Sequence, residues 1–172
     1  MANNVYSTIR FESGNIDSER EFLRVFTAIE GLGERGLQYA DFLPKEDVLD
    51  ASYMDHFIGP RIANITEFMG TKVSITSAWI SPDVFFDELT SWIQDVDPHA
   101  KLTMTYEDEF YMFAGVWYSN VNNKTAFKED TIQREESGGW FRKQLDVDEV
   151  DPGDFQDYVS DTVDGWRVGM IS

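Results

Sequence analysis

Residues 101–118 read KLTMTYEDEFYMFAGVWY and hold two consecutive strand patterns. In the first, apolar side chains alternate with threonines, which is typical of a strand with one buried face. The second, over residues 110–118, is apolar on both faces and therefore predicts a central strand. Asn122-Asn123 suits a turn that needs positive φ, and residues 125–133 follow as a third strand. These segments predict an antiparallel meander.

The chain opens with a strand followed by a helix. Residues 5–11, VYSTIRF, alternate along their length and are rich in β-branched and aromatic types, as expected for a strand. Ser18 and Glu21 have the spacing of a capping box, and the apolar helical stripe that follows ends at Gly31 and Gly33. A strand and a helix, followed later by a meander, predict an α+β fold.

The middle of the chain predicts further helices and one more strand. Residues 61–69 carry apolar side chains at helical spacing before Gly70, which suits a helix C-cap. Residues 72–80 predict a buried strand, and residues 85–96 carry the apolar stripe of a helix. A short helix is also expected near residues 50–56. We therefore expect an antiparallel or mixed sheet with helices packed on one face.

Three groups of short motifs lie within residues 1–120. They are Asn3-Asn4-Val5, then Gly70-Thr71-Lys72 with Ala78-Trp79-Ile80-Ser81-Pro82, then Tyr106-Glu107 with Phe113 and Gly115. These motifs resemble the YubB-type ferredoxin-like domain family of phage and plasmid proteins. The resemblance implies a ferredoxin-like sandwich carried by mobile elements, and it supplies no catalytic residue. "Ferredoxin-like" describes topology only, because an iron–sulfur cluster needs thiolates and the chain has no cysteine.

The length and composition suit one folded domain. The 172 residues are 42% hydrophobic, well above the content of chains that stay disordered. We expect a single domain, with an α+β core over residues 1–135 and an acidic C-terminal extension over residues 136–172 whose helix packs on the core. The opening MANNVYSTIRF lacks the pattern of a secretory signal, so we expect a cytoplasmic protein, in the host cytoplasm if a phage encodes it.

The charge of the chain is strongly negative. There are 32 acidic and 14 basic residues, which give a formal net charge of −18. Such a charge repels nucleic-acid phosphates and anionic lipids, so we expect no direct binding to nucleic acid or to a membrane. It favours a basic protein partner instead. The alternative is that the acidity only keeps the protein soluble, and the oligomeric state stays open.

The acids collect near the C-terminus, where no Lys or Arg occurs between residues 146 and 164. Four of them recur at intervals of three, four and three, so they form one stripe of a predicted helix, ~4.5 to 6 Å apart along its axis. That row resembles the phosphates of one nucleic-acid strand, although an ordinary amphipathic helix would look the same. The predicted binding surface comprises Asp146, Asp148, Glu149, Asp151, Asp154, Asp157, Asp161 and Asp164, with Trp140 and Phe141 as apolar anchors.

Few residues could carry catalytic or metal chemistry. His56 and His99 have no neighbouring nucleophile or second ligand, so we assign them surface or capping roles. Residues 146–157 begin like an EF-hand but lack its glycine and its final glutamate. Glu107 and Glu109 share one face near a turn, where solvated acids are common. We expect no catalytic residue, no cofactor and no metal site.

These observations predict a non-enzymatic accessory protein of a phage or another mobile element. It would bind a basic, nucleic-acid-binding host protein through an acidic surface that mimics DNA. The second hypothesis is a virion or assembly component whose acidity serves only solubility. An enzyme that acts on a small molecule is the third.

Overall fold

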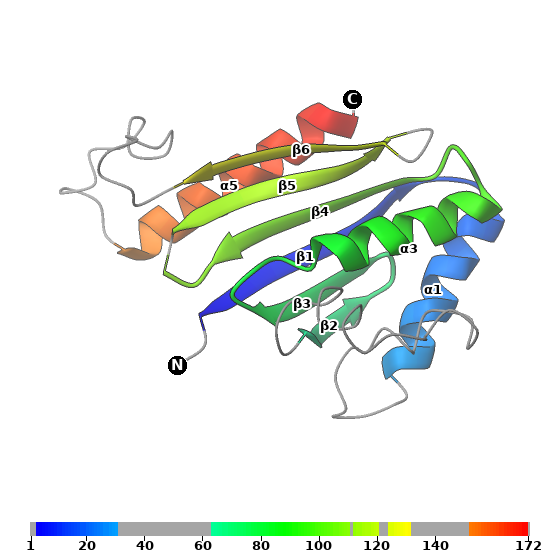
Figure 1. Ribbon diagram of the computed structural model, residues 1–172, viewed down its shortest axis with the longest axis horizontal. Coiled ribbons are helices and arrows are strands. Elements are labelled where there is room, and N and C mark those ends of the chain that lie inside the picture. Colours follow the sequence, from blue (N-terminus) through cyan, green and yellow to red (C-terminus); the bar gives the residue numbers. More distant parts are fainter. Residues whose placement is uncertain (1–2, 31–62, 111, 121–123, 132–151, 172) are drawn as a thin grey trace.

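The computed structural model describes residues 3–30, 63–110, 112–120, 124–131 and 152–171. The described elements follow one another along the chain, as Figure 1 shows, in the order β1 (Asn4–Ser13), α1 (Ile16–Glu30), β2 (Ala63–Met69), β3 (Lys72–Ala78), α3 (Asp83–Val96), β4 (Lys101–Asp108), β5 (Phe113–Asn120), β6 (Lys124–Thr131) and α5 (Pro152–Ile171). The expected helix near residues 50–56 lies outside the described residues.

The six described strands form one sheet in the order β2-β3-β1-β4-β5-β6, and every neighbouring pair is antiparallel. The segment from β1 to β4 has the β-α-β-β-α-β order of the ferredoxin-like fold, with β1 and β3 at its centre. Strands β5 and β6 extend this sheet as the expected meander. The predicted α+β class and ferredoxin-like sandwich are therefore confirmed.

The predicted helix over residues 61–69 is wrong, because this segment forms strand β2. A bulge between Ile65 and Glu67 shifts the register against β3, so Ile65 pairs with Ile75 and Phe68 pairs with Val73. The bulge interrupts the alternation of period two that marks a strand in the sequence. Gly70, read as a helix cap, instead has φ +58° in the turn that joins β2 to β3.

Helix α1 begins before the predicted capping box. Asn15 precedes the helix, and its side-chain Oδ1 accepts a hydrogen bond from the Ser18 N–H at 2.9 Å. Asp97, after α3, accepts from the Asn15 N–H at 2.8 Å and from the Ser18 hydroxyl at 3.2 Å. These bonds lower the pKa of Asp97 and join the start of α1 to the end of α3. Glu21 does not cap; it binds Arg24 and the Trp92 indole.

One face of the sheet holds the main core. Alternate residues of β1 and β4 pack there against α1 and α3, which lie on the near side of the sheet in Figure 1. The apolar stripes predicted for both helices are buried, and the Phe22 and Phe26 ring centroids are 4.8 Å apart. The core comprises Val5, Ile9, Phe11, Phe22, Val25, Phe26, Val73, Ile75, Phe85, Phe86, Leu89, Ile93, Ala100, Leu102, Met104 and Tyr106.

The acidic helix α5 covers part of the opposite face of the sheet (Figure 1). Val159 and Val163 of α5 pack there on Ala114 and Val116 of β5. Strand β5 therefore has apolar side chains on both faces, as its sequence predicted.

The two ends of the strands are named here by residues of β1. The end of the sheet where β1 begins and where β3 and β4 end is called the Asn4 end, and the opposite end, where β1 finishes, is called the Ser13 end.

Tyr106 crosses β5 to reach β6. Its hydroxyl donates a hydrogen bond to Glu129 Oε2 at 2.6 Å, and Gly115 of β5 lies beneath the ring. A Cβ at position 115 would lie 2.5 Å from the Tyr106 hydroxyl oxygen and 2.6 Å from the Lys128 backbone oxygen. Burial and the neighbouring Glu129 carboxylate raise the pKa of Tyr106, so the hydroxyl keeps its proton and remains a donor. Glycine at this position allows the crossing.

We predict that Gly115→Ala lowers the free energy of unfolding by about 1–3 kcal/mol, because the new methyl group has no free space. Gly165→Ala is the matched control, since a Cβ at this position of α5 meets nothing within 4 Å. It should be neutral or stabilise by about 0.5–1 kcal/mol, as alanine favours a helix over glycine. Urea denaturation of both variants measures this. Equal stability of the two would contradict the packing of Tyr106 described above.

Candidate functional site

The predicted acidic surface is only partly within the described residues. Trp140, Phe141, Asp146, Asp148, Glu149 and Asp151 lie outside them. Asp154 belongs to α5, although its side chain is not described. The side chains of Asp157, Asp161 and Asp164 are described. The candidate site is therefore built from α5 and the sheet face beneath it.

Two carboxylates of α5 point to solvent. Asp157 and Asp161 are exposed, while Val159 and Val163, on the other side of the helix, are buried. Among the described residues, no Lys or Arg forms an ion pair with either aspartate. The helix is fixed by its apolar side, so these charges are held in a defined position.

Asp164 has a different environment from the rest of the predicted stripe. It is half-buried, and its Oδ1 accepts a hydrogen bond from Arg167 Nε at 2.8 Å. This bond, together with the nearby charges of Arg10 and Lys72, lowers the pKa of Asp164. Asp164 thus helps to seat α5 on the sheet instead of extending a row of open carboxylates.

Basic residues gather on the sheet face that carries α5. Arg10 of β1 and Lys72 of β3 are direct cross-strand partners, and Lys128 Nζ of β6 lies 4.2 Å from the centroid of the Trp166 ring. A lysine over an indole face is a favourable cation–π contact. The acidic helix therefore lies on a face of the sheet where one of its carboxylates, that of Asp164, meets positive charge.

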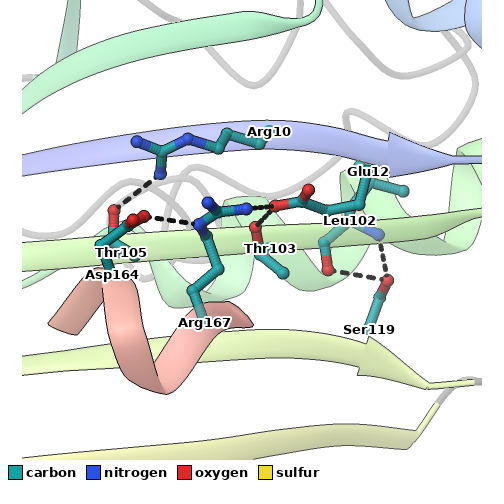
Figure 2. Close-up of polar contacts among 8 residues, drawn as sticks. All are labelled: Arg10, Glu12, Leu102, Thr103, Thr105, Ser119, Asp164 and Arg167. Atoms are coloured by element: carbon teal, nitrogen blue, oxygen red, sulfur yellow. Dashed lines mark hydrogen bonds and ion pairs between the residues drawn. The ribbon is translucent and has the colours of Figure 1, made fainter. Parts of the chain in front are cut away.

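Arg167 is the main link between α5 and β1, as Figure 2 shows. Its guanidinium binds Asp164 on its own helix and forms an ion pair with Glu12 of β1. Glu12 also accepts a hydrogen bond from the Thr103 hydroxyl at 2.5 Å. Both partners in the Arg167–Glu12 pair are largely buried, with side-chain exposures of 14% and 13%, so solvent screens the pair only weakly.

A groove of about 280 Å³ runs beside α5 over β1 and β4. Arg10 contributes the one guanidinium of this lining and donates to Thr105 Oγ1 at 3.2 Å. Hydroxyl and carboxylate oxygens provide the other polar groups, so the groove can accept hydrogen bonds from amines and amides. Its lining consists of Tyr6, Thr8, Arg10, Thr105, Tyr106, Glu107, Ser160, Asp161, Val163 and Asp164.

Glu107 and Glu109 have separate structural partners. Glu107 Oε2 accepts from the Ser160 hydroxyl of α5 at 2.8 Å, whereas Glu109 Oε2 accepts from the Asn4 N–H at 3.1 Å. Partial burial raises the pKa of Glu107 and exceeds the opposite effect of its hydrogen bonds. Glu107 therefore holds α5 on the sheet, and Glu109 holds the start of β1.

The sequence did not predict the network of Arg10, Glu12, Asp164 and Arg167. The local pattern that bears on it is the alternation of β1, which places Thr8, Arg10 and Glu12 on the face opposite the core residues. Polar residues at every second position showed that this face would lie outside the main core. They did not show that a helix more than 150 positions along the chain would bind there.

The described residues include no group of three or more His, Asp or Glu side chains that could hold a metal ion. His99 is exposed, and its backbone N–H donates to Asp97 Oδ1 at 3.0 Å. His56 lies outside the described residues. No helix in the described ranges is long and apolar enough to cross a membrane.

Comparison with known proteins adds no assignment. No protein-family model matches the chain, and no curated protein or solved structure gives a significant match.

We predict that Arg167→Met lowers the free energy of unfolding by about 1.5–3 kcal/mol, because Glu12 and Asp164 both lose a charged hydrogen-bond donor. Arg24→Met is the control: its pair with Glu21 is on an exposed helix surface, and its loss should cost about 0.2–0.5 kcal/mol. Urea denaturation gives both values. The backbone amides of α5 should exchange hydrogen faster in Arg167→Met but not in Arg24→Met. Unchanged exchange in Arg167→Met would contradict the role of Arg167 in holding α5 on β1.

We predict that Glu107→Gln makes the protein more stable at neutral pH. The pKa of Glu107 is raised in the folded state, so folding favours the protonated carboxyl group. The free energy of unfolding therefore falls as the pH rises from the ordinary pKa of glutamate through the raised pKa of Glu107. The advantage of glutamine should therefore be large at about pH 8 and small at about pH 4. Glu67→Gln, at an exposed position of β2, should change the unfolding free energy little at either pH. A pH-independent effect of Glu107→Gln would contradict this reading.

Proposed function

We propose that this chain is a non-enzymatic accessory protein of a phage or another mobile element, and that it binds a basic, nucleic-acid-binding host protein through the acidic surface of α5. The observation that carries the proposal is the exposure of Asp157 and Asp161 on a helix held rigidly to the sheet. The origin in a mobile element rests on the sequence resemblance alone.

The distribution of charge supports binding over a purely solubilising role. Two basic side chains between α5 and the sheet have partners within the protein. Arg167 binds Glu12 and Asp164, and Lys128 lies against the Trp166 ring. The outward carboxylates of Asp157 and Asp161 are exposed and form no ion pair with a Lys or Arg of the described residues. Like charges one turn apart on a helix repel each other and cost stability, which solubility alone does not require.

A fixed helix also lowers the cost of binding. Seating on β5 and β1 orders α5 before any partner arrives, so association loses less conformational freedom than it would with a flexible acidic tail. The exposed carboxylates of Asp157 and Asp161, one turn apart on this helix, would present charge in the way that neighbouring phosphates of a nucleic-acid strand do. A cytoplasmic location, inside a bacterial host, agrees with such a partner.

The test compares two variants that remove the same charge from different surfaces. In the first, Asp157→Asn and Asp161→Asn neutralise α5; in the second, Asp17→Asn and Asp95→Asn neutralise exposed positions on α1 and α3, across the sheet. Basic proteins are captured from a bacterial lysate on each immobilised protein, and the affinity of the main captured protein is then measured. Duplex DNA added as a competitor tests mimicry directly.

We expect the α5 variant to bind the captured protein about tenfold more weakly at ~0.15 M salt, and the control variant to bind within about twofold of the original. DNA should displace the captured protein. Equal losses in both variants would show that only the total charge matters, and this result would favour the hypothesis that the acidity serves solubility.

A further inference from the structure

Apolar side chains are exposed together at the Asn4 end of the sheet. Trp79 and Ile80 follow β3, with exposures of 51% and 48%, and Phe110 and Met112 lie between β4 and β5, with exposures of 53% and 44%. The registers of β1 with β3 and with β4 bring both segments to this end, near the N label in Figure 1. Exposed apolar side chains that gather at one place on a protein often mark an interaction surface.

Trp79 is held in a strained backbone conformation. Its φ is +72°, a region that glycine favours and that bulky residues rarely adopt. Three hydrogen bonds fix the turn: the Trp79 N–H donates to the Asn3 oxygen at 2.7 Å, the Ile80 N–H to the Ala78 oxygen at 2.9 Å, and the Ser77 hydroxyl to the Ile80 oxygen at 2.7 Å. The strain therefore presents an indole to solvent where glycine would fit more easily.

The two apolar segments flank the same short piece of backbone. The Trp79 N–H binds the Asn3 oxygen, and the Glu109 N–H binds the Asn4 oxygen at 2.8 Å. After β4, the Met112 N–H donates to Asp108 Oδ2 at 3.0 Å, which holds Met112 close to the end of this strand. The side chains thus project from turns that the sheet holds in place.

The described charged side chains at this end of the sheet are acidic. Glu107 and Glu109 lie there, and the bond from Ser160 to Glu107 places the first turns of α5, with the exposed Asp157, beside them. The described bases of the sheet and α5 lie elsewhere: Arg10, Lys72, Lys101, Lys124 and Arg167 toward the Ser13 end, and Lys128 in the middle of β6 beside the Trp166 ring. An apolar surface with an acidic border fits a partner that carries both positive charge and apolar side chains.

We propose that the Asn4 end of the sheet is the apolar anchor for the basic partner, and that it binds a cationic amphipathic segment of that partner through Trp79, Ile80, Phe110 and Met112. This inference rests on the proposed function. It assigns to these four side chains the apolar contact with the partner that the sequence analysis expected from Trp140 and Phe141. A second copy of the chain is a poor occupant, because each copy carries a net charge of −18 and the acidic border is repeated on both.

The experiment uses two synthetic peptides of equal length and equal positive charge. In one peptide, leucines lie along one side of a lysine-rich helix; in the other, serines replace the leucines. Fluorescence anisotropy measures the binding of each to the full protein at about 0.1 M and about 0.5 M salt, because the higher salt screens the charges and leaves the apolar contact. We expect the leucine peptide to bind about tenfold more tightly than the serine peptide at the higher salt.

Trp79→Gly separates binding from folding. It should keep or raise the melting temperature, because glycine relieves the positive φ, and it should abolish the preference for leucine. Phe110→Ser, in the second segment, should weaken the preference as well. Ile16→Ser is the matched control, since Ile16 is an equally exposed apolar residue, at 58%, at the start of α1 near the Ser13 end. It should leave the preference unchanged.

Two results would overturn the anchor while sparing the proposed function. One is that the original protein binds both peptides equally at each salt concentration, with binding that still depends on Asp157 and Asp161. The other is that sedimentation shows self-association that Trp79→Gly abolishes, since a second copy would then occupy the surface. If neither peptide binds even at low salt, the anchor and the electrostatic proposal both fail.

Discussion

Repulsion among its own carboxylates is the constraint that shapes this protein. A chain with a net charge of −18 must bury an apolar core while its acids stay apart or find cations. The alternation of strands β1 and β3 meets both needs, because one face receives the core side chains and the other receives Arg10 and Lys72. The acidic helix α5 lies on that second face. Asp164 of this helix therefore approaches the sheet where the positive charges of Arg10 and Lys72 are available.

The seating of α5 determines which of its acids remain open. Val159 and Val163 turn toward β5, and Arg167 reaches Glu12, so the rotation of the helix about its axis is fixed. Asp164 is then drawn to the sheet and shares Arg167, while Asp157 and Asp161 face solvent. The same contacts that stabilise the helix thus select the surface that a partner can meet.

Periodicity in the sequence predicted most of the fold and failed where local geometry departs from it. The alternating strands and the apolar stripes of α1, α3 and α5 were visible, but the bulge in β2 interrupts the alternation that would have marked this segment as a strand. The acids of the site were visible as a linear pattern. The pairing of Arg167 with Glu12 was not, because it joins residues 155 positions apart and leaves no local trace.

The Asn4 end of the sheet combines two features that do not serve folding. Half-exposed apolar side chains contribute little to the core, and the positive φ of Trp79 opposes the folded state. Beside them lies a helix whose open charges act at a distance. Charge attraction extends ~8 Å in physiological salt, whereas apolar burial acts only on contact. Under the proposed function, the carboxylates of α5 would therefore set how fast a basic partner associates, and the apolar side chains at the Asn4 end would set how slowly it dissociates.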